Sequence, residues 1–177
     1  LQYTKDADYL DSSPYLCPNY IGEPEEYPDT VELEQMMEEG RTKMFMKAVN
    51  VLPLEVRPVE TPANKYSDID RTCTWIRFRP KFRDLQQKDG LPVATFISDF
   101  SIVQVAGEIL ERSDIRFEVG SSLHHTMWIH KHELDPHGWY LTVVECHVMA
   151  LGRIRLDSRV YNERKECVIS VLQEGYL

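Results

Sequence analysis

The sequence predicts an α+β domain in which a curved antiparallel sheet wraps around one long central helix. Three observations lead to this fold. The 177 residues include 42% hydrophobic and 28% charged residues, which are ordinary globular values. One segment, 98–112, carries a helical pattern, and strand-like runs lie on both sides of it. A single helix buried among six or seven antiparallel strands has few packing solutions, and a sheet curved around the helix is the natural one.

The helix is expected over residues 98–112 (SDFSIVQVAGEILER). Ser98 or Asp99 stands at its start, where a side-chain oxygen can accept hydrogen bonds from free backbone N–H groups. The apolar residues cover most of the helix circumference, so we expect the helix to be buried nearly all round. They are Phe100, Ile102, Val103, Val105, Ala106, Ile109 and Leu110.

The strands are expected in seven runs of apolar and β-branched residues, with short turn signals such as DPHG at 135–138 and NERKE at 162–166. The run from 151 to 161 alternates best, with Ile154, Leu156 and Val160 on one face and arginines on the other. Three of the runs precede the helix and four follow it: 44–51, 54–59, 73–79, 122–130, 139–149, 151–161 and 166–173.

The leading segment, 1–42, differs from the rest of the chain in charge and composition. It holds eleven acidic and two basic residues, and so accounts for the whole net charge of −9. Four of the ten prolines lie in its first 28 residues, which is typical of a linker or a strap on a surface. Asp29 or Thr30 is expected to cap a short helix that Gly40 closes. The predicted domains are therefore a strap, 1–42, and a folded body, 43–177.

Several classes of protein are disfavoured by composition. No basic stripe interleaved with aromatic residues is present, which argues against nucleic-acid binding. No apolar run approaches the roughly 20 residues that span a bilayer, so we expect a soluble protein without a signal peptide. The four cysteines are widely spaced and form no CxxC pair, which favours reduced, mostly buried thiols over a disulfide framework.

Three segments carry a resemblance to a known family: FISDFSIV (96–103), SSLHHTMWIH (121–130) and VLQEGYL (171–177). With LPLEVRPVE (52–60) and TWIRFR (74–79), they resemble the carboxy-terminal hotdog domain of type II, double-hotdog acyl-CoA thioesterases. The resemblance runs in order from about residue 50 to the end. It implies the hotdog fold, in which a curved antiparallel sheet wraps around one central helix.

The resemblance also implies a catalytic group, namely Asp99, Ser122 and Gln173. In the family an Asp, a Ser or Thr, and a Gln position and polarise a water that attacks the thioester carbonyl. Asp99 would be the base, and Ser122 and Gln173 would orient the water. This sequence departs from the family at His124, where an Asp is usual, and at Thr126, where a Ser is usual. We expect His124 to share a strand face with Ser122.

The polar residues allow three other interpretations: a metal site, a site for the phosphates of CoA, and a different catalytic mechanism. All six histidines lie between 124 and 147, and His124, His130 and His132 would share a strand face, but three positions spread along one strand cannot converge on one zinc ion. No metal and no cofactor are therefore expected. Arg153, Arg155 and Arg159 fit a solvated sheet face better than a site for the phosphates of CoA. A Ser-His-Asp nucleophile built from Ser122, His124 and Asp99 is the alternative mechanism.

The resemblance implies hydrolysis of fatty acyl-CoA to free fatty acid and CoA. The alternative is a non-catalytic hotdog half that binds acyl-CoA or serves as a pairing domain. The expected partners are the substrate and either an amino-terminal hotdog half or a second copy of the chain, as a homodimer. A peroxisomal or cytoplasmic location is expected, although the ending Gly-Tyr-Leu is not a peroxisomal Ser-Lys-Leu type signal.

Overall fold

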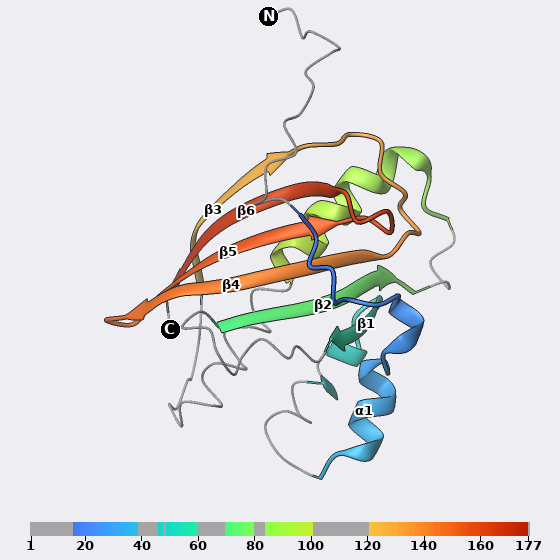
Figure 1. Cartoon of the computed structure of the whole chain (residues 1–177), viewed down its shortest axis with the longest axis horizontal. Coiled ribbons are helices and arrows are strands. Elements are labelled where there is room, and N and C mark those ends of the chain that lie inside the picture. The colour runs from blue at the N-terminus through green and yellow to red at the C-terminus, as the bar shows by residue number, and fades with distance from the viewer. Residues whose placement is uncertain are drawn as a thin grey trace, which may run out of the picture.

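The computed structural model describes residues 16–38, 46–47, 49–59, 70–79, 84–100 and 121–176. Within these residues the chain forms one six-stranded antiparallel sheet with the spatial order β1-β2-β4-β5-β6-β3, curved around a helix (Figure 1). This confirms the α+β hotdog fold. The strands are β1 (Leu54–Val59), β2 (Asp70–Phe78), β3 (Ser121–Ile129), β4 (Tyr140–Ala150), β5 (Arg153–Tyr161) and β6 (Cys167–Tyr176).

The helix packed behind the sheet in Figure 1 covers residues 90–100. It follows a 3₁₀ turn, η4 (Gln87–Asp89), and carries Pro92 in its first turn, where proline is tolerated. The helix therefore begins eight residues before the predicted start, and Ser98 and Asp99 do not cap it. Ser98 instead donates its hydroxyl hydrogen to the Thr95 carbonyl oxygen, 2.7 Å away, as serines inside helices commonly do. The predicted remainder, 101–112, lies outside the described residues.

The helix start is pressed against the loop between β3 and β4. A Cβ atom on Gly90 would lie 1.8 Å from the carbonyl oxygen of Leu134, so no larger residue fits without moving the backbone. Further along, Val93, Ala94 and Ile97 are buried against the sheet, whereas Phe96 and Asp99 are exposed. Over residues 90–100 the helix therefore has one buried face and one exposed face. Most of the apolar residues on which the prediction of all-round burial rests lie beyond residue 100, outside the described residues.

The main core lies between this helix and the inner, helix-facing side of the sheet. Every strand except β3 contributes fully buried side chains to it or to the smaller cluster beside it. In β5 the predicted alternation is confirmed: Ile154, Leu156 and Val160 are buried, and the arginines between them point to the other side. The core residues from the sheet include Leu54, Val56, Ile76, Tyr140, Val160, Ile169 and Val171.

The outer side of the sheet is covered in part by the leading segment, drawn in blue in Figure 1. Ile21 is buried in a second cluster with Trp75 and Tyr161. The indole N–H of Trp75 donates to the carbonyl oxygen of Gly22 at 3.2 Å, and the hydroxyl of Tyr161 donates to that of Leu16 at 3.3 Å. These contacts hold residues 16–27 against the sheet as a strap, the arrangement that their composition favours.

The short helix after the strap is α1 (Thr30–Met36), and Asp29 caps it as predicted, accepting from the Glu32 amide at 2.8 Å. It ends at Met36, four residues before Gly40, so Gly40 does not close it. The residues that follow are acidic, and negative charge opposes the partial negative charge at a helix carboxyl end.

One predicted strand is wrong. In the run 44–51, residues 46–47 and 49–50 are helical and Val51 lies in a turn. Asn50 donates to the Glu34 carboxylate of α1 at 2.6 Å, and Val49 is buried in the main core, so this stretch joins α1 to the core without pairing as a strand. The other six runs are strands: 54–59 matches β1 at both ends, and no end of the other five moves by more than three residues. All four cysteines are free thiols, as expected.

Candidate active site

The side-chain amide of Gln173 joins the three residues that the family resemblance singled out. Gln173 lies on β6, faces the helix and is only 1% exposed. Its Nε2 atom donates to the Oγ atom of Ser122 at 2.5 Å and to Oδ1 of Asp99 at 3.3 Å. Both amide hydrogens are thereby used, and one buried side chain fixes a residue of β3 and a residue of the helix relative to each other.

A bulge in β3 brings Ser122 to this position. The β3–β6 register pairs Ser122 with Gly175 and His124 with Glu174, so Leu123 is the extra residue. Gly175 and Gln173 are both buried on the inner face of β6, and Ser122 lies on that same face. A Cβ atom on Gly175 would come within 3.1 Å of the Ile154 side chain, so glycine keeps β6 tightly packed beside Ser122.

The bulge places His124 on the opposite, outer face of the sheet. His124 pairs with Glu174, and its Nε2 atom lies 2.6 Å from the Oγ1 atom of Thr126. The prediction that His124 shares a face with Ser122 is therefore wrong. Without a bulge, residues two apart would point the same way, but the extra residue reverses that relation. His124 is thus not in a position to take a proton from the Ser122 hydroxyl.

Asp99 occupies the exposed side of the helix at the level of Gln173. Beside it, the Ser98 hydroxyl lies 3.8 Å from the Met127 sulfur, which seats this turn of the helix against β3. Only Oδ1 of Asp99 has a hydrogen-bond partner among the described residues, so Oδ2 can accept a proton or a hydrogen bond from a small molecule. The Ser122 hydroxyl accepts from Gln173 and keeps its own hydrogen to donate.

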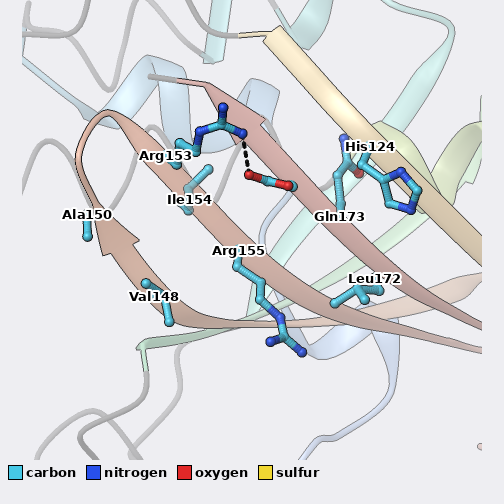
Figure 2. A pocket seen from close by; sticks show the side chains of 9 residues that line it. His124, Val148, Ala150, Arg153, Ile154, Arg155, Leu172 and Gln173 are labelled. Atoms are coloured by element: carbon cyan, nitrogen blue, oxygen red, sulfur yellow. Dashed lines mark hydrogen bonds and ion pairs between the residues drawn. The ribbon is translucent and has the colours of Figure 1, made fainter.

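A hollow of about 500 Å³, drawn in Figure 2, lies near His124 and Arg155, and its lining also includes Gln173. Arg153 there pairs with Glu174 at 2.6 Å, and Arg159, further along β5, reaches the Glu145 carboxylate at 3.5 Å. Figure 2 shows Arg155 pointing away from His124 and Gln173. The three arginines therefore lie on the outer face of the sheet, opposite Asp99, and two of them, Arg153 and Arg159, are ion-paired there.

The histidines do not assemble into a metal site within the described residues. The Nε2 atom of His130 lies 2.9 Å from the Ser170 hydroxyl, and burial lowers the pKa of His130, which favours its neutral form. His132 lies beyond the end of β3, so it does not share a strand face with His124 as predicted.

His125, a polar residue beside the site, was not among the residues that the sequence predicted there. It pairs directly with Gln173 across β3 and β6, and so lies on the inner face with Ser122. In the sequence, only its position within the segment SSLHHTMWIH points to a role for His125. In that segment the neighbouring His124 is the residue that departs from the family pattern.

The curved sheet, the packed helix and the polar group at the sheet edge define a hotdog-fold domain. The chain belongs to the acyl-CoA thioesterase C-terminal domain family, whose model matches residues 24–177. No curated protein sequence matches the chain. Among the helices of the described residues, none combines the length and the apolar character needed to cross a membrane.

Solved structures show the same fold. An acyl-CoA thioesterase II, TesB2, from Mycobacterium marinum superposes with a TM-score of 0.64 at 18% identity, covering 91% of this chain and 55% of that one. A putative thioesterase from Novosphingobium aromaticivorans gives 0.59 at 18% identity, covering 92% and 54%. A hot dog fold protein of unknown function from Alicyclobacillus acidocaldarius gives 0.52 at 13% identity, covering 91% and 54%. The chain thus spans about half the length of these structures.

Proposed function

We propose that this domain hydrolyses fatty acyl-CoA thioesters to free fatty acid and CoA, using a water activated by Asp99 and oriented by Ser122 and Gln173. The observation that carries the proposal is the pair of hydrogen bonds from the buried Gln173 amide to both other residues. A buried amide that holds a carboxylate and a hydroxyl in fixed positions supports a held water, and family membership supports acyl-CoA as the substrate class.

The chemistry needs no covalent intermediate. The Asp99 carboxylate takes a proton from water as the water oxygen bonds to the thioester carbonyl carbon. The carbonyl π electrons move to oxygen, while the Ser122 hydroxyl keeps the attacking water in place. When the carbonyl re-forms, the carbon–sulfur bond breaks and CoA leaves as a thiolate, which takes up a proton. Asp99 then releases its proton to solvent.

Exposure of the site fits this reaction. Ser122 and Asp99 are both exposed, whereas Gln173, which links them, is buried. Water and a thioester can therefore reach the two reacting side chains while their separation stays fixed. Ser122 as a nucleophile is less well supported, because His124 lies on the other face of the sheet.

A turnover assay with a series of acyl-CoA chain lengths tests the proposal. We expect the release of free CoA by the wild-type chain and a large loss of release in Asp99→Asn. Binding of acyl-CoA without turnover at any chain length would contradict hydrolysis by the isolated chain.

A second function, a pairing half that does not itself turn over substrate, is favoured by one observation. β3 pairs with β6 on one side only within the described residues, and its burial pattern is exposed at most positions. Such an edge is a template for another strand. Turnover that appears only when an amino-terminal hotdog half is added would favour this second function.

A further inference from the structure

Gln173 has one polar atom that nothing in the described part of the chain satisfies. Its Oε1 atom is buried and has no hydrogen-bond partner there, although both hydrogens on Nε2 are used. A buried acceptor without a donor costs free energy, and such atoms in native proteins call for an explanation. Rotation of the amide by half a turn would point Oε1 at the Asp99 carboxylate, so a further contact is needed to hold the amide in its present orientation.

His125 is placed to supply the missing donor. It stands directly opposite Gln173 in the β3–β6 register, and directly opposed side chains have their Cβ atoms roughly 4.5 to 5.5 Å apart. The backbone N–H of His130 donates to the Val168 carbonyl at 2.8 Å, so these two residues form a hydrogen-bonded pair. Hydrogen-bonded and non-hydrogen-bonded pairs alternate along antiparallel strands, so His125 and Gln173 form a non-hydrogen-bonded pair, the kind in which the side chains lie closer together. The imidazole is exposed and makes no hydrogen bond to a described residue that a turn of the ring would break.

We propose that His125 is a positioning residue of the site: a ring N–H of His125 donates to Oε1 of Gln173 and fixes the amide with Nε2 toward Ser122 and Asp99. Imidazole carries at least one N–H in both its neutral and its protonated form, so the bond persists across the working pH range. The inference rests on the proposed hydrolysis for its effect on rate, and on the structure alone for the bond itself.

The adjacent histidine provides a matched control. His124 lies on the outer face, next to Thr126, and does not contact the Gln173 amide. His125→Phe keeps a flat ring but removes every N–H, and His124→Phe makes the same change one residue away. We expect His125→Phe to lower kcat roughly tenfold, the equivalent of one net hydrogen bond, with little change in KM. His124→Phe should leave both within about twofold.

Rescue distinguishes a lost donor from lost packing. Asn and Gln carry an amide N–H₂ near the positions of the two ring nitrogens, so His125→Asn or His125→Gln should recover most of the lost kcat. Failure of both amides to exceed His125→Phe would overturn the proposal, as would a His124→Phe variant as slow as His125→Phe.

A double-mutant cycle ties the effect to Gln173. Gln173→Met keeps the side-chain length and removes Oε1, so adding His125→Phe to it should change neither kcat nor the unfolding midpoint further. Fully additive effects in both measurements would contradict the proposed bond. Because the unfolding midpoint needs no substrate, the cycle can be read even if Asp99→Asn retains full activity and the proposed hydrolysis itself fails.

Discussion

Ser122 and His124 lie on opposite faces of strand β3, although only one residue separates them. The bulge at Leu123 turns Ser122 toward Gln173 and the helix, and leaves His124 beside Thr126 on the outer face. This relation bears on the choice between two mechanisms. A Ser-His-Asp nucleophile needs the imidazole within hydrogen-bond reach of the hydroxyl, whereas a held water needs only Asp99, Ser122 and Gln173.

Asp99→Asn tests the base. Asn keeps an oxygen that can accept from Gln173, so folding should be nearly unchanged, but it does not take a proton from water. We expect kcat to fall by roughly 10² to 10⁴, measured as release of free CoA, with an unfolding midpoint close to wild type. Near-full activity in the folded variant would remove Asp99 from the mechanism.

Ser122 variants test the role of the hydroxyl. Ser122→Thr keeps the hydroxyl and should keep substantial activity, and Ser122→Ala should lose about tenfold to a hundredfold because the hydroxyl that orients the water disappears. Mass spectrometry of enzyme quenched during turnover should show no added acyl group on Ser122. An acyl adduct there would establish a covalent route and overturn the attack by water.

Most of the fold was predictable because the strands carry their signal locally. The alternation of Ile154, Leu156 and Val160 with arginines predicts one buried and one exposed face, and the structure confirms it. The strand predicted over 44–51 was wrong because a short apolar stretch fits a helix or a strand equally well. The predicted helix start was wrong because Ser98 and Asp99 are common capping residues, whereas Pro92 in a first turn was the better signal.

The site was predictable as a set of residues but not as a geometry. The motifs led to Asp99, Ser122 and Gln173, and the structure brings these three side chains together. Their catalytic roles remain a proposal. The bulge was not predictable, because Leu123 is an ordinary strand residue and carries no glycine signal. The face of His124, and with it the place of His125, depends entirely on that one extra residue.

The strap should contribute measurably to stability. Ile21 is 2% exposed and packs with Trp75 and Tyr161, so Ile21→Ala should lower the free energy of unfolding by about 2–5 kcal/mol. Leu16→Ala is the matched control, because that side chain is 58% exposed and its hydrogen bond uses only the backbone. Urea titrations measure both. Equal, small effects would show that the strap does not stabilise the fold, and the boundary at residue 42 stays a prediction in either case.

The thiols should be slow to react in the folded protein. Burial raises the pKa of Cys73 to about 12 and that of Cys167 to about 11, so each is almost wholly protonated at pH 8. The reactive thiolate fraction of Cys167 is then roughly a hundredfold or more below that of an ordinary cysteine of pKa near 8.5. Iodoacetamide at pH 8, followed by peptide mass spectrometry, should label both residues much faster in urea than in buffer. Equal rates in the two conditions would contradict the burial of these thiols.

The exposed edge of β3 should drive association. Only one side of β3 is paired within the described residues, and Trp128 on this strand is 51% exposed. A second copy can pair along the same edge by two-fold symmetry, which would continue the sheet and keep both helices on one side of it. Light scattering at micromolar concentration should therefore give twice the chain mass of 20.7 kDa. Trp128→Lys adds a charge at the edge and should shift the mass toward the monomer, whereas Val51→Lys, at another exposed apolar position away from β3, should not. A wild-type mass of one chain would show that a second copy does not cover this edge, and an unchanged dimer in Trp128→Lys would place the contact on another surface.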